Sequence, residues 1–504
     1  MKKVPSTVSP VIAVDRKAAK PLHKQIYDAY RGMIVGRNLG AGQQIPSTRA
    51  LAAELKISRI PVLTAYAQLL AEGYFEARPG AGTFVCSSLP EQFTASEGTA
   101  ATGRREFRPG ARSVSRRALL LPRYERLPWL RGAGAFSVSQ PAFEQFPFQI
   151  WSRIVMRHTR SPHVSGLQYG GPLGFEPLRD AICTYLRTAR AVHCEPRQVM
   201  IVNGSQQALE IATRVLLDEG SPAWIEEPGY WLTRHVLNAA GCRLVLVPVD
   251  SEGLDVAAGL KACRKAKAAF VAPSHQYPLG ATMSASRRLQ LLDWAQHSGA
   301  WIVEDDYDSE YRYGSMPIAS LQGLDHNSRV IYIGTFSKTL FPSLRLGYLV
   351  IPPDLADRFA AIRHAMDIGP PHFFQAVLTD FMREGHFARH IRRMRQLYSQ
   401  RRSALVEALG KEFGTALEVV GAEAGMYLAV LLPKGCRDEE LAARAARARL
   451  WIQPLSPAYA GGTRRQGLVL GFGSTSEEEM PRAVQKLASV LGADRSFNAA
   501  KRQT

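Results

Sequence analysis

The stretch Gly334-Thr335-Phe336-Ser337-Lys338-Thr339-Leu340 decides the fold of the larger part of this chain. It follows the apolar run Val330–Ile333, which is typical of a buried strand, so Lys338 is expected just beyond a strand end. A second strand-like run, Trp301–Val303, leads into Glu304-Asp305-Asp306-Tyr307. A lysine with hydroxyls, a carboxylate and an aromatic ring at strand ends is the set that a pyridoxal phosphate Schiff base requires. We therefore predict a pyridoxal phosphate site.

The spacing around this lysine strengthens the prediction. Asp305 and Tyr307 are two residues apart, so on an extended segment both side chains point to one side. A carboxylate there keeps the pyridine nitrogen protonated, and a tyrosine can donate to the phenolic oxygen. A lone lysine would be interpreted as a solvated surface residue. With Thr335, Ser337 and Arg345 around Lys338, the imine role is the stronger interpretation.

Length and charge indicate more than one function. A chain of 504 residues is expected to form two or three domains, and its 46% apolar residues allow a sizeable core. The net charge of +19 is unevenly spread. Residues 1–88 hold 12 basic and 5 acidic residues, and residues 89–131 hold 9 and 4. This concentration favours contact with a polyphosphate such as DNA, with an acidic membrane surface as the weaker alternative.

Several classes of protein are not indicated. The six cysteines are scattered without a CxxC or Cys/His cluster, so neither a metal site nor a disulfide framework is predicted. No sustained apolar stretch follows Lys2 and Lys3, and no apolar run reaches 18 residues. We expect a cytoplasmic protein that does not enter a membrane.

The N-terminal part has the pattern of a winged helix-turn-helix, which we assign to residues 15–88. After a helix that begins at Pro21, Ser47 is expected to cap a short helix, and Ser58 to cap the next one after a tight turn. Two short strands then enclose the turn 78–82, which forms the wing. A small protein-binding helical bundle is the alternative, disfavoured by the basic charge and the wing.

The predicted DNA contacts lie on the second helix, on the helix before it and at the wing tip. Arginine and hydroxyl side chains can reach phosphates or base edges, and glycines let the wing approach the backbone closely. These residues are Arg49, Ser58, Arg59, Thr64, Arg78, Gly80 and Gly82.

Residues 89–131 are predicted to form a flexible basic linker, because they combine Ser, Thr, Ala, Gly and Pro with repeated arginines. The arginines are either simply solvated or add sequence-independent affinity for phosphates. Two apolar patches, Leu119–Leu121 and Leu127–Leu130, are expected to dock on the large domain.

From residue 132 to 496 the chain alternates apolar runs with helical stretches, which predicts an α/β domain with a mostly parallel central sheet. The run Val199–Val202 leads into Asn203-Gly204-Ser205-Gln206, a helix start suited to a phosphate. Other predicted strand ends carry Tyr230 and His275. Strand carboxyl ends are where such sheets bind ligands.

These motifs resemble those of two known families. The run from Ile45 to Val85 resembles the winged helix-turn-helix of GntR-type bacterial regulators. Residues 135–490 resemble fold-type I pyridoxal phosphate aminotransferases, specifically the aminotransferase-like half of MocR-type regulators. The motifs are Y-x-x-P-x-G-x-x-x-L-R at 169–179, G-S-Q-Q-A-L at 204–209, E-x-P-G-Y at 226–230, P-S-H-Q-x-P-x-G at 273–280, E-D-D-Y-D-S-E at 304–310 and G-T-F-S-K-T-L-F-P-x-L-R-L-G-Y at 334–348.

The resemblance implies a smaller C-terminal subdomain, a homodimer and a role for each matching residue. Tyr230 would stack on the pyridine ring, and Asp305 would lie at its nitrogen. Tyr307, with His275 or Gln276, would lie near the phenolic oxygen of the cofactor. Tyr169 would reach into the site of the partner subunit. The phosphate would be held by Ser205, Gln206, Thr335 and Arg345.

One departure from the catalytic relatives concerns the substrate carboxylate. Where those enzymes place an arginine in R-x-x-F, this chain has Val469. Arg464 and Arg465 lie just upstream and are possible substitutes. Because a bidentate arginine is a strong carboxylate anchor, we expect cofactor binding with weak or no transaminase turnover.

Three functions fit the sequence to different degrees. The first is a transcriptional regulator that binds a double-stranded DNA operator and senses pyridoxal phosphate, or an amino compound that forms an external aldimine with it. The second is an active aminotransferase with an appended DNA-binding module, which Val469 disfavours. The third is a DNA-binding protein whose large domain only dimerises, which the complete lysine, aspartate and tyrosine set disfavours. We predict the first.

Overall fold

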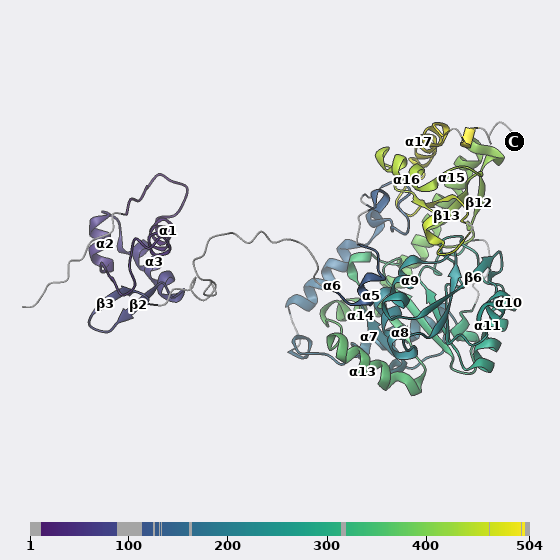
Figure 1. Ribbon diagram of the computed structural model, residues 1–504, viewed down its shortest axis with the longest axis horizontal. Coiled ribbons are helices and arrows are strands. Elements are labelled where there is room, and N and C mark those ends of the chain that lie inside the picture. Colours follow the sequence, from purple (N-terminus) through teal and green to yellow (C-terminus); the bar gives the residue numbers. More distant parts are fainter. Residues whose placement is uncertain are drawn as a thin grey trace, which may run out of the picture. The chain divides into compact units, whose positions relative to one another are not determined.

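The computed structural model describes residues 12–87, 113–123, 127–130, 132, 134–160, 164–313, 319–462, 464–494 and 496–498. The chain divides into two compact units, Met1–Arg112 and Ser113–Thr504, and each is described by itself (Figure 1). Most of the predicted linker, residues 89–112, lies outside the described residues. Within the described chain, no helix is long and apolar enough to cross a membrane.

The first unit is a winged helix-turn-helix, as predicted. Its helices are α1 (Leu22–Val35), α2 (Thr48–Glu54) and α3 (Arg59–Ala71), and its strands are β1 (Gln44–Ile45), β2 (Phe75–Arg78) and β3 (Gly82–Val85). The strands form an antiparallel sheet in the order β1-β3-β2, in which β2 and β3 make the wing.

The two serines that precede α2 and α3 behave differently. Ser47 caps α2 as predicted, since its hydroxyl accepts a hydrogen bond from the Ala50 N–H at 3.2 Å. Ser58 takes the cap position of α3, but its side chain makes no capping hydrogen bond, so that part of the prediction is wrong. Between the helices, Lys56 adopts a left-handed conformation with φ 52°, which makes the turn tight.

Helical spacing explains the core of this unit. Ile26, Tyr30 and Ile34 recur every four residues, lie on one face of α1 and are completely buried. Tyr30 meets Tyr66 of α3 and Phe75 of β2 edge to face, with ring centroids 5.7 and 5.3 Å apart. The helix α3 is therefore packed against an aromatic core.

The second unit begins with the short helix α5 (Arg116–Leu119) and the 3₁₀ turn Pro128–Leu130. Trp129 is buried in the core, which agrees with the docking predicted for the second apolar patch. The first patch does not dock through its leucines, because Leu119 and Leu120 are 70% and 56% exposed. The neighbouring Arg117 instead pairs with Glu219 of the large domain.

An eight-stranded sheet forms the centre of the second unit, in the order β4-β11-β10-β9-β8-β5-β6-β7. Five of its strands, β10, β9, β8, β5 and β6, are parallel to their neighbours in this series, whereas β11 and β7 pair antiparallel. The predicted mostly parallel sheet is confirmed. The strands are β4 (Val199–Val202), β5 (Pro222–Glu227), β6 (Arg243–Asp250), β7 (Gly253–Leu254), β8 (Ala268–Val271), β9 (Trp301–Asp306), β10 (Val330–Thr335) and β11 (Gly347–Val350).

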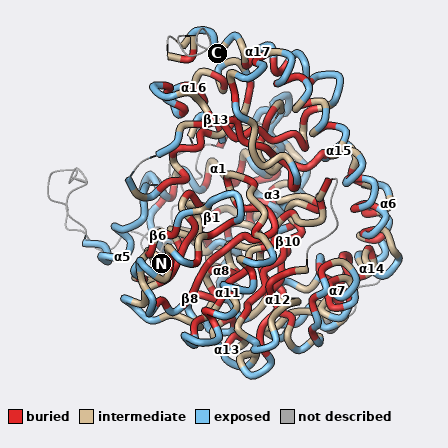
Figure 2. The backbone as a smooth tube through the Cα atoms, turned by 90° about the vertical axis from the view of Figure 1, so that its right-hand side faces the viewer, coloured by how far each residue is buried: buried red, intermediate tan, exposed pale blue. Residues whose placement is uncertain are grey.

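Helices cover both faces of this sheet because its strands are apolar on both sides. On β10, Ile331 and Ile333 join the core on one face, and Val330 and Tyr332 face the other. The tube is mostly buried around β8 and β10 (Figure 2). The first face is covered by α8 (Ser205–Leu216), α9 (Trp231–Ala239) and α13 (Ala356–Asp367). The other is covered by α6 (Phe148–Arg160), α7 (Glu176–Ala189), α10 (Val256–Cys263), α11 (Ala285–Ser298) and α14 (Phe373–Arg383).

A smaller C-terminal subdomain follows the long helix α15 (His386–Phe413), as the resemblance implies (Figure 1). Its antiparallel sheet has the order β12-β13-β15-β14 and packs against α15, α16 (Asp438–Arg447) and α17 (Met480–Gly492). The strands are β12 (Glu418–Val420), β13 (Tyr427–Leu431), β14 (Gln453–Pro454) and β15 (Gly467–Gly471).

Candidate functional site

A cavity of about 360 Å³ opens at the carboxyl ends of β5, β8, β9 and β10, where the C-terminal subdomain meets the large sheet. This is the edge at which parallel sheets bind ligands. Eight of the eleven predicted cofactor residues line it: Lys338, Asp305, Tyr307, Tyr230, Ser205, Gln206, Thr335 and Arg345.

Sheet register brings the lysine and the aspartate together. In the parallel pair of β9 and β10, Asp305 is opposite Ile333, and Lys338 follows shortly after β10 ends. The Lys338 amine donates a hydrogen bond to the Ser139 carbonyl at 3.4 Å. Burial lowers the pKa of this amine, although Asp308 and Asp305 oppose the shift. A lowered pKa favours the neutral amine, the form that attacks a carbonyl.

Asp305 carries a carboxyl oxygen that can accept a further hydrogen bond. Its Oδ1 is buried and has no hydrogen-bond partner among the described residues. Burial raises the pKa of this carboxyl to about 7, and the neighbouring Asp306 and Asp308 add to the effect. An unpaired oxygen on a carboxyl group that lines a cavity fits a cationic N–H donor, such as a protonated pyridine nitrogen.

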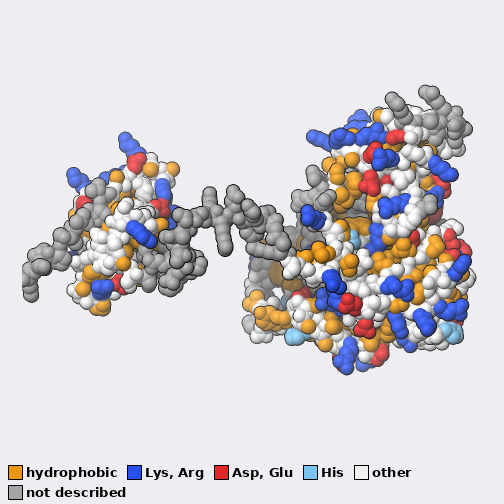
Figure 3. All heavy atoms as spheres, viewed as in Figure 1, with side chains coloured by type: hydrophobic (Ala, Val, Ile, Leu, Met, Phe, Trp, Pro, Cys, Tyr) orange, Lys and Arg blue, Asp and Glu red, His pale blue; other side chains and the backbone are white. Residues whose placement is uncertain are grey.

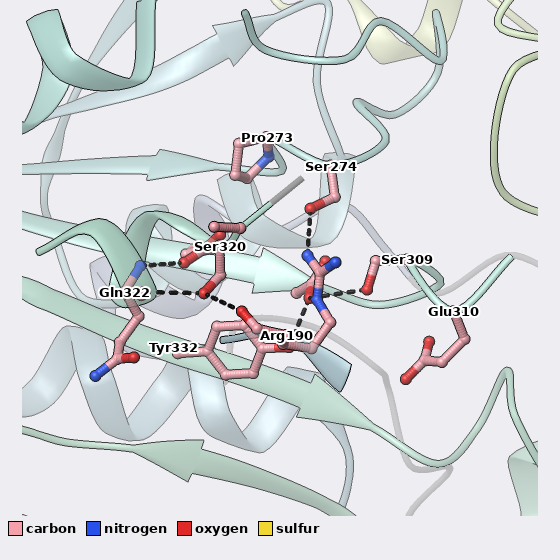
Figure 4. Close-up of polar contacts among 12 residues, drawn as sticks. Arg190, Pro273, Ser274, Ser309, Glu310, Ser320, Gln322 and Tyr332 are labelled. Atoms are coloured by element: carbon pink, nitrogen blue, oxygen red, sulfur yellow. Dashed lines mark hydrogen bonds and ion pairs between the residues drawn. The ribbon is translucent and has the colours of Figure 1, made fainter. Parts of the chain in front are cut away.

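The neighbouring Asp306 belongs to a buried polar network, and Figure 4 shows its members Arg190, Ser274, Ser309 and Tyr332. Asp306 Oδ2 lies 2.7 Å from Arg190 Nε and accepts hydrogen bonds from the Tyr332 and Ser309 hydroxyls at 2.5 and 2.9 Å. Burial opposes ionisation, but Arg190 and these donors hold the pKa of Asp306 below its ordinary value. Arg190 also donates to Ser274 at 2.8 Å. These hydrogen bonds hold Asp306, the last residue of β9, in place.

The start of α8 forms the opposite end of the cavity. Gly204 precedes it with φ 85°, a conformation that favours glycine, and a Cβ there would lie 3.3 Å from Arg345 Nη1. Arg345 has φ 52° and donates to the Asn203 carbonyl at 2.6 Å. Ser205 and Gln206 occupy the first helical positions, where backbone N–H groups lack intrahelical partners. A helix start beside a guanidinium suits a phosphate.

Tyr307 is fixed by its hydroxyl. It donates to the His275 carbonyl at 2.7 Å and lies 2.8 Å from the Tyr427 hydroxyl. Burial, together with Tyr427 and Asp308, raises the pKa of Tyr307 far above its ordinary value, so this side chain stays neutral.

Three of the predicted cofactor residues lie outside the lining. His275 is buried behind Tyr307, with Nδ1 3.0 Å from Asp308 Oδ2. Gln276 is also buried and donates to the Pro228 carbonyl at 2.7 Å. Tyr169 is 86% exposed. The roles that the resemblance implies for these residues, and for the eight in the lining, stay predictions.

The cavity also includes residues that the sequence did not single out. Tyr277 lies in the 273–280 motif, next to residues that were chosen, and its hydroxyl donates to Gln453 Oε1 at 2.9 Å. Gln453 comes from β14 and Ser139 from a loop, and no sequence pattern marks either. Arg234 lies one helical turn after Tyr230, a spacing that offers the only hint of its place.

Residues 457–461 of the C-terminal subdomain are fastened beside this cavity. Arg234 donates to the carbonyls of Pro457 and Ala458 at 2.7 and 3.1 Å. Glu227, at the end of β5, accepts hydrogen bonds from the N–H groups of Ala460 and Gly461 at 2.9 and 2.8 Å. The Gly229 N–H adds a bond to the Ala458 carbonyl at 3.1 Å.

Val469 is not among the described residues that line the cavity. Its side chain is completely buried in an apolar cluster with Tyr427, Leu455 and Tyr459. Arg464 and Arg465 are exposed and do not line the cavity, and Arg465 lies 3.4 Å from Glu418.

In the first unit, the outer face of α3 combines polar and apolar side chains. Ser58, Arg59 and Thr64 are exposed, and so are Ile60 at 73% and Leu63 at 43%. Arg59 Nε donates to the Thr48 hydroxyl at 3.1 Å, which ties it to α2. Thr64 donates to the Ile60 carbonyl of its own helix at 3.1 Å. The two apolar side chains suit contact with thymine methyl groups.

The other predicted DNA contacts lie on α2 and the wing. Arg49 is exposed on α2. Arg78 lies 2.9 Å from Glu76 and stacks on the Phe84 ring, 4.4 Å from its centroid. At the wing tip, Gly80 and Gly82 have φ 75° and 108°, which explains glycine at both positions. Figure 3 shows basic side chains on the visible face of both units.

Comparison with known proteins agrees with the two-part architecture. Residues 22–85 match the bacterial regulatory proteins of the gntR family, and residues 136–487 match aminotransferase class I and II. The fold and site thus define a transcriptional regulator with an aminotransferase-like domain. The chain belongs to the MocR-type regulators of the GntR superfamily.

Individual relatives extend over nearly the whole chain. A probable rhizopine catabolism regulatory protein, MocR of Rhizobium meliloti, is 39% identical and covers 95% of this chain and 96% of its own length. The pyridoxine biosynthesis regulator PdxR of Corynebacterium glutamicum is 30% identical over 95% and 98%. The α-aminoadipate aminotransferase LysN of Thermus thermophilus, solved with N-(5'-phosphopyridoxyl)-L-leucine, is 28% identical, with a TM-score of 0.67 over 75% and 95%.

Proposed function

We propose that this protein is a pyridoxal phosphate-dependent transcriptional regulator whose aminotransferase-like domain senses an amino compound or the cofactor itself. The observation that carries the proposal is the cavity lined by Lys338, by Asp305 with its unpaired Oδ1, and by the start of α8. The same chain carries an exposed recognition helix on a winged helix-turn-helix.

The residues of the cavity fit the cofactor. Ser205, Gln206, Thr335 and Arg345 would hold its phosphate, and Tyr230 would cover its ring. Asp305 would keep the ring nitrogen protonated, and the Lys338 amine would bind the cofactor covalently. When bound, pyridoxal phosphate supplies an electrophilic carbon that primary amines attack.

On the DNA side, GntR-type domains bind operators. We assign sequence recognition to the exposed face of α3, with Arg59 and Thr64 for polar contacts and Ile60 and Leu63 for thymine methyl groups. Arg49, Arg78 and the wing glycines would contact phosphates. A regulator of bacterial operators works in the cytoplasm.

For an effector in the cavity to change DNA binding, the protein must have two arrangements that the effector binds with different affinities. We propose a homodimer in which Tyr169 reaches the partner's cavity. Its 86% exposure, next to the 76% exposed Leu167, leaves an apolar surface for a second copy of the chain.

The competing function is an active aminotransferase. Turnover requires a substrate held with its α-proton over the lysine, and small misplacements there are costly. Val469 removes the usual carboxylate anchor, and neither Arg464 nor Arg465 replaces it in the lining. We therefore expect amines to change the cofactor spectrum with little transfer to a keto acid.

One experiment separates the two functions. The cofactor-loaded protein would be titrated with amines while its absorbance and its affinity for a selected DNA fragment are measured together. We expect both to respond to the same ligands. Multiple-turnover transamination at ~1 per second or faster, with no ligand effect on DNA binding, would favour the enzyme instead.

A further inference from the structure

The chemistry of the cavity wall beyond Lys338 limits which effector fits. On that side lie Ser139, Val138, Tyr277 and Gln453. Lys338 donates to the Ser139 carbonyl, Tyr277 donates to Gln453 of the C-terminal subdomain, and Val138 packs with Tyr277 on the cluster around Val469. The polar members of this wall are uncharged: the hydroxyls of Tyr277 and Ser139 and the amide of Gln453. The remaining member, Val138, is apolar, so this part of the wall favours neutral groups.

Each cation of the described lining has another task. Lys338 would bind the cofactor, and Arg345 lies at the phosphate end, on the Asn203 carbonyl. Arg234 directs Nη1 and Nη2 at the carbonyls of Ala458 and Pro457. No further lysine or arginine occurs among the described lining residues.

Val469 adds an apolar layer beneath the same wall. It is completely buried in a cluster on which Tyr277 and Tyr307, both in the lining, also pack. A carboxylate placed here would lose water, and it would gain a cationic partner only if Arg234 gave up its hydrogen bonds to the carbonyls of Pro457 and Ala458, which is costly. A hydroxyl would lose less and has Tyr277, Gln453 and Ser139 as hydrogen-bonding partners.

We propose that the effector is a primary amine that bears neutral hydrogen-bonding groups, such as hydroxyls, and no carboxylate. This inference rests on the proposed function and narrows it. The amine reacts at the cofactor, and the uncharged wall selects what the amine carries. Amino alcohols and amino polyols belong to this class, whereas α-amino acids do not.

Matched pairs of ligands test the inference. The full-length protein loaded with pyridoxal phosphate would be titrated with serinol and serine, and with tyrosinol and tyrosine. The members of each pair differ in a hydroxymethyl group against a carboxylate. Cofactor absorbance reports binding, and fluorescence anisotropy reports the affinity for a DNA fragment that the protein selects from a random pool. We expect each amino alcohol to bind at least tenfold more tightly than its amino acid.

A charge placed on the wall should reverse this preference. Gln453 is half-buried, so Gln453→Arg is better tolerated than an arginine at the completely buried Val469. We expect Gln453→Arg to favour serine over serinol by at least tenfold, about 1.4 kcal/mol relative to no preference. The matched control is Gln453→Leu, which removes the amide without adding charge and should not gain serine binding.

Two outcomes would overturn the inference, and they are distinguishable. If the wild type binds serine as tightly as serinol, and Arg234→Gln removes that binding, Arg234 is a carboxylate anchor and only the inference fails. If no amine or amino acid changes absorbance or DNA affinity, although borohydride fixes the cofactor on Lys338, the sensing function fails as well.

Discussion

The cavity and the recognition helix place their functional residues in opposite surroundings. In the cavity, Lys338 and Asp305 are withdrawn from water, and burial shifts the pKa of both. On α3, Arg59 and Ile60 are exposed and have few neighbours. The difference teaches that the cavity depends on the whole fold of its domain, whereas the helix depends on a few local contacts. Substitutions should therefore act globally in one and locally in the other.

The largest effect is expected at Lys338. In Lys338→Ala no amine remains at this position to hold the cofactor, so borohydride should fix none of it, which mass spectrometry of peptides would measure. The control is Lys267→Ala, at an exposed lysine of the same unit, which should leave attachment unchanged. Pyridoxal phosphate recovered on another lysine would show that the cavity has been assigned wrongly.

A second effect concerns pH. Glu226 is buried in the cavity wall, and burial raises its pKa from 4.5 to about 8. The folded protein therefore keeps a proton that the unfolded chain loses. The stability from this group is complete below about pH 4.5 and is lost as pH rises through 8, at no more than about 1.4 kcal/mol per pH unit.

In Glu226→Gln, the loss of stability between pH 5 and pH 8 should therefore become smaller. Urea unfolding followed by tryptophan fluorescence measures this, because all seven tryptophans lie in the second unit. Glu439→Gln, at an exposed position, is the control. Identical pH slopes for wild type and Glu226→Gln would contradict the buried, protonated glutamate.

In the first unit, Arg59 on α3 and Arg78 on the wing strand β2 should contact DNA in different ways. Arg59→Ala should weaken specific DNA binding by about 1–3 kcal/mol and relax sequence preference. Arg78 is already held by Glu76 and Phe84, so Arg78→Ala should weaken binding to all sequences alike and reduce the salt slope by about 1. Anisotropy with specific and unrelated DNA at several salt concentrations measures both. Equal losses of specificity would remove the distinction between base and phosphate contact.

The smallest expected effect is the difference in helix stability between Ser47→Ala and Ser58→Ala. Ser47→Ala removes a capping hydrogen bond and should destabilise α2 by about 1 kcal/mol. Ser58 makes no such bond, so Ser58→Ala should change the stability of α3 by only a few tenths of a kcal/mol. Hydrogen exchange of peptides from both helices in the full-length protein measures this. Stronger loss of protection in Ser58→Ala would contradict the difference in capping.

How far the sequence predicts the site depends on where its residues come from. The alternation of Asp305, Asp306 and Tyr307 and the parallel strand before Lys338 follow from local spacing, so their meeting at one sheet edge was predictable. Gln453 and Ser139 come from segments that only the packing of the C-terminal subdomain brings to the cavity.

The fold was predictable to a similar extent. Strand and helix periodicity predicted the mostly parallel sheet and the winged helix-turn-helix. The exposed Leu119 and Leu120 were misjudged, because an apolar patch does not reveal whether a cavity exists to receive it. The cap at Ser58 was expected from its position alone, whereas the hydrogen bond depends on the rotamer of the side chain.

The fastening of residues 457–461 beside the cavity has a mechanical consequence. Arg234 donates to two backbone carbonyls of this segment, and Glu227 accepts hydrogen bonds from two of its backbone N–H groups. Arg234 also lines the cavity. If an amine binds in this cavity as we propose, a ligand that displaces this guanidinium would break the two hydrogen bonds of Arg234 to the C-terminal subdomain. The size of the effector would then determine how firmly that subdomain is held to the sheet.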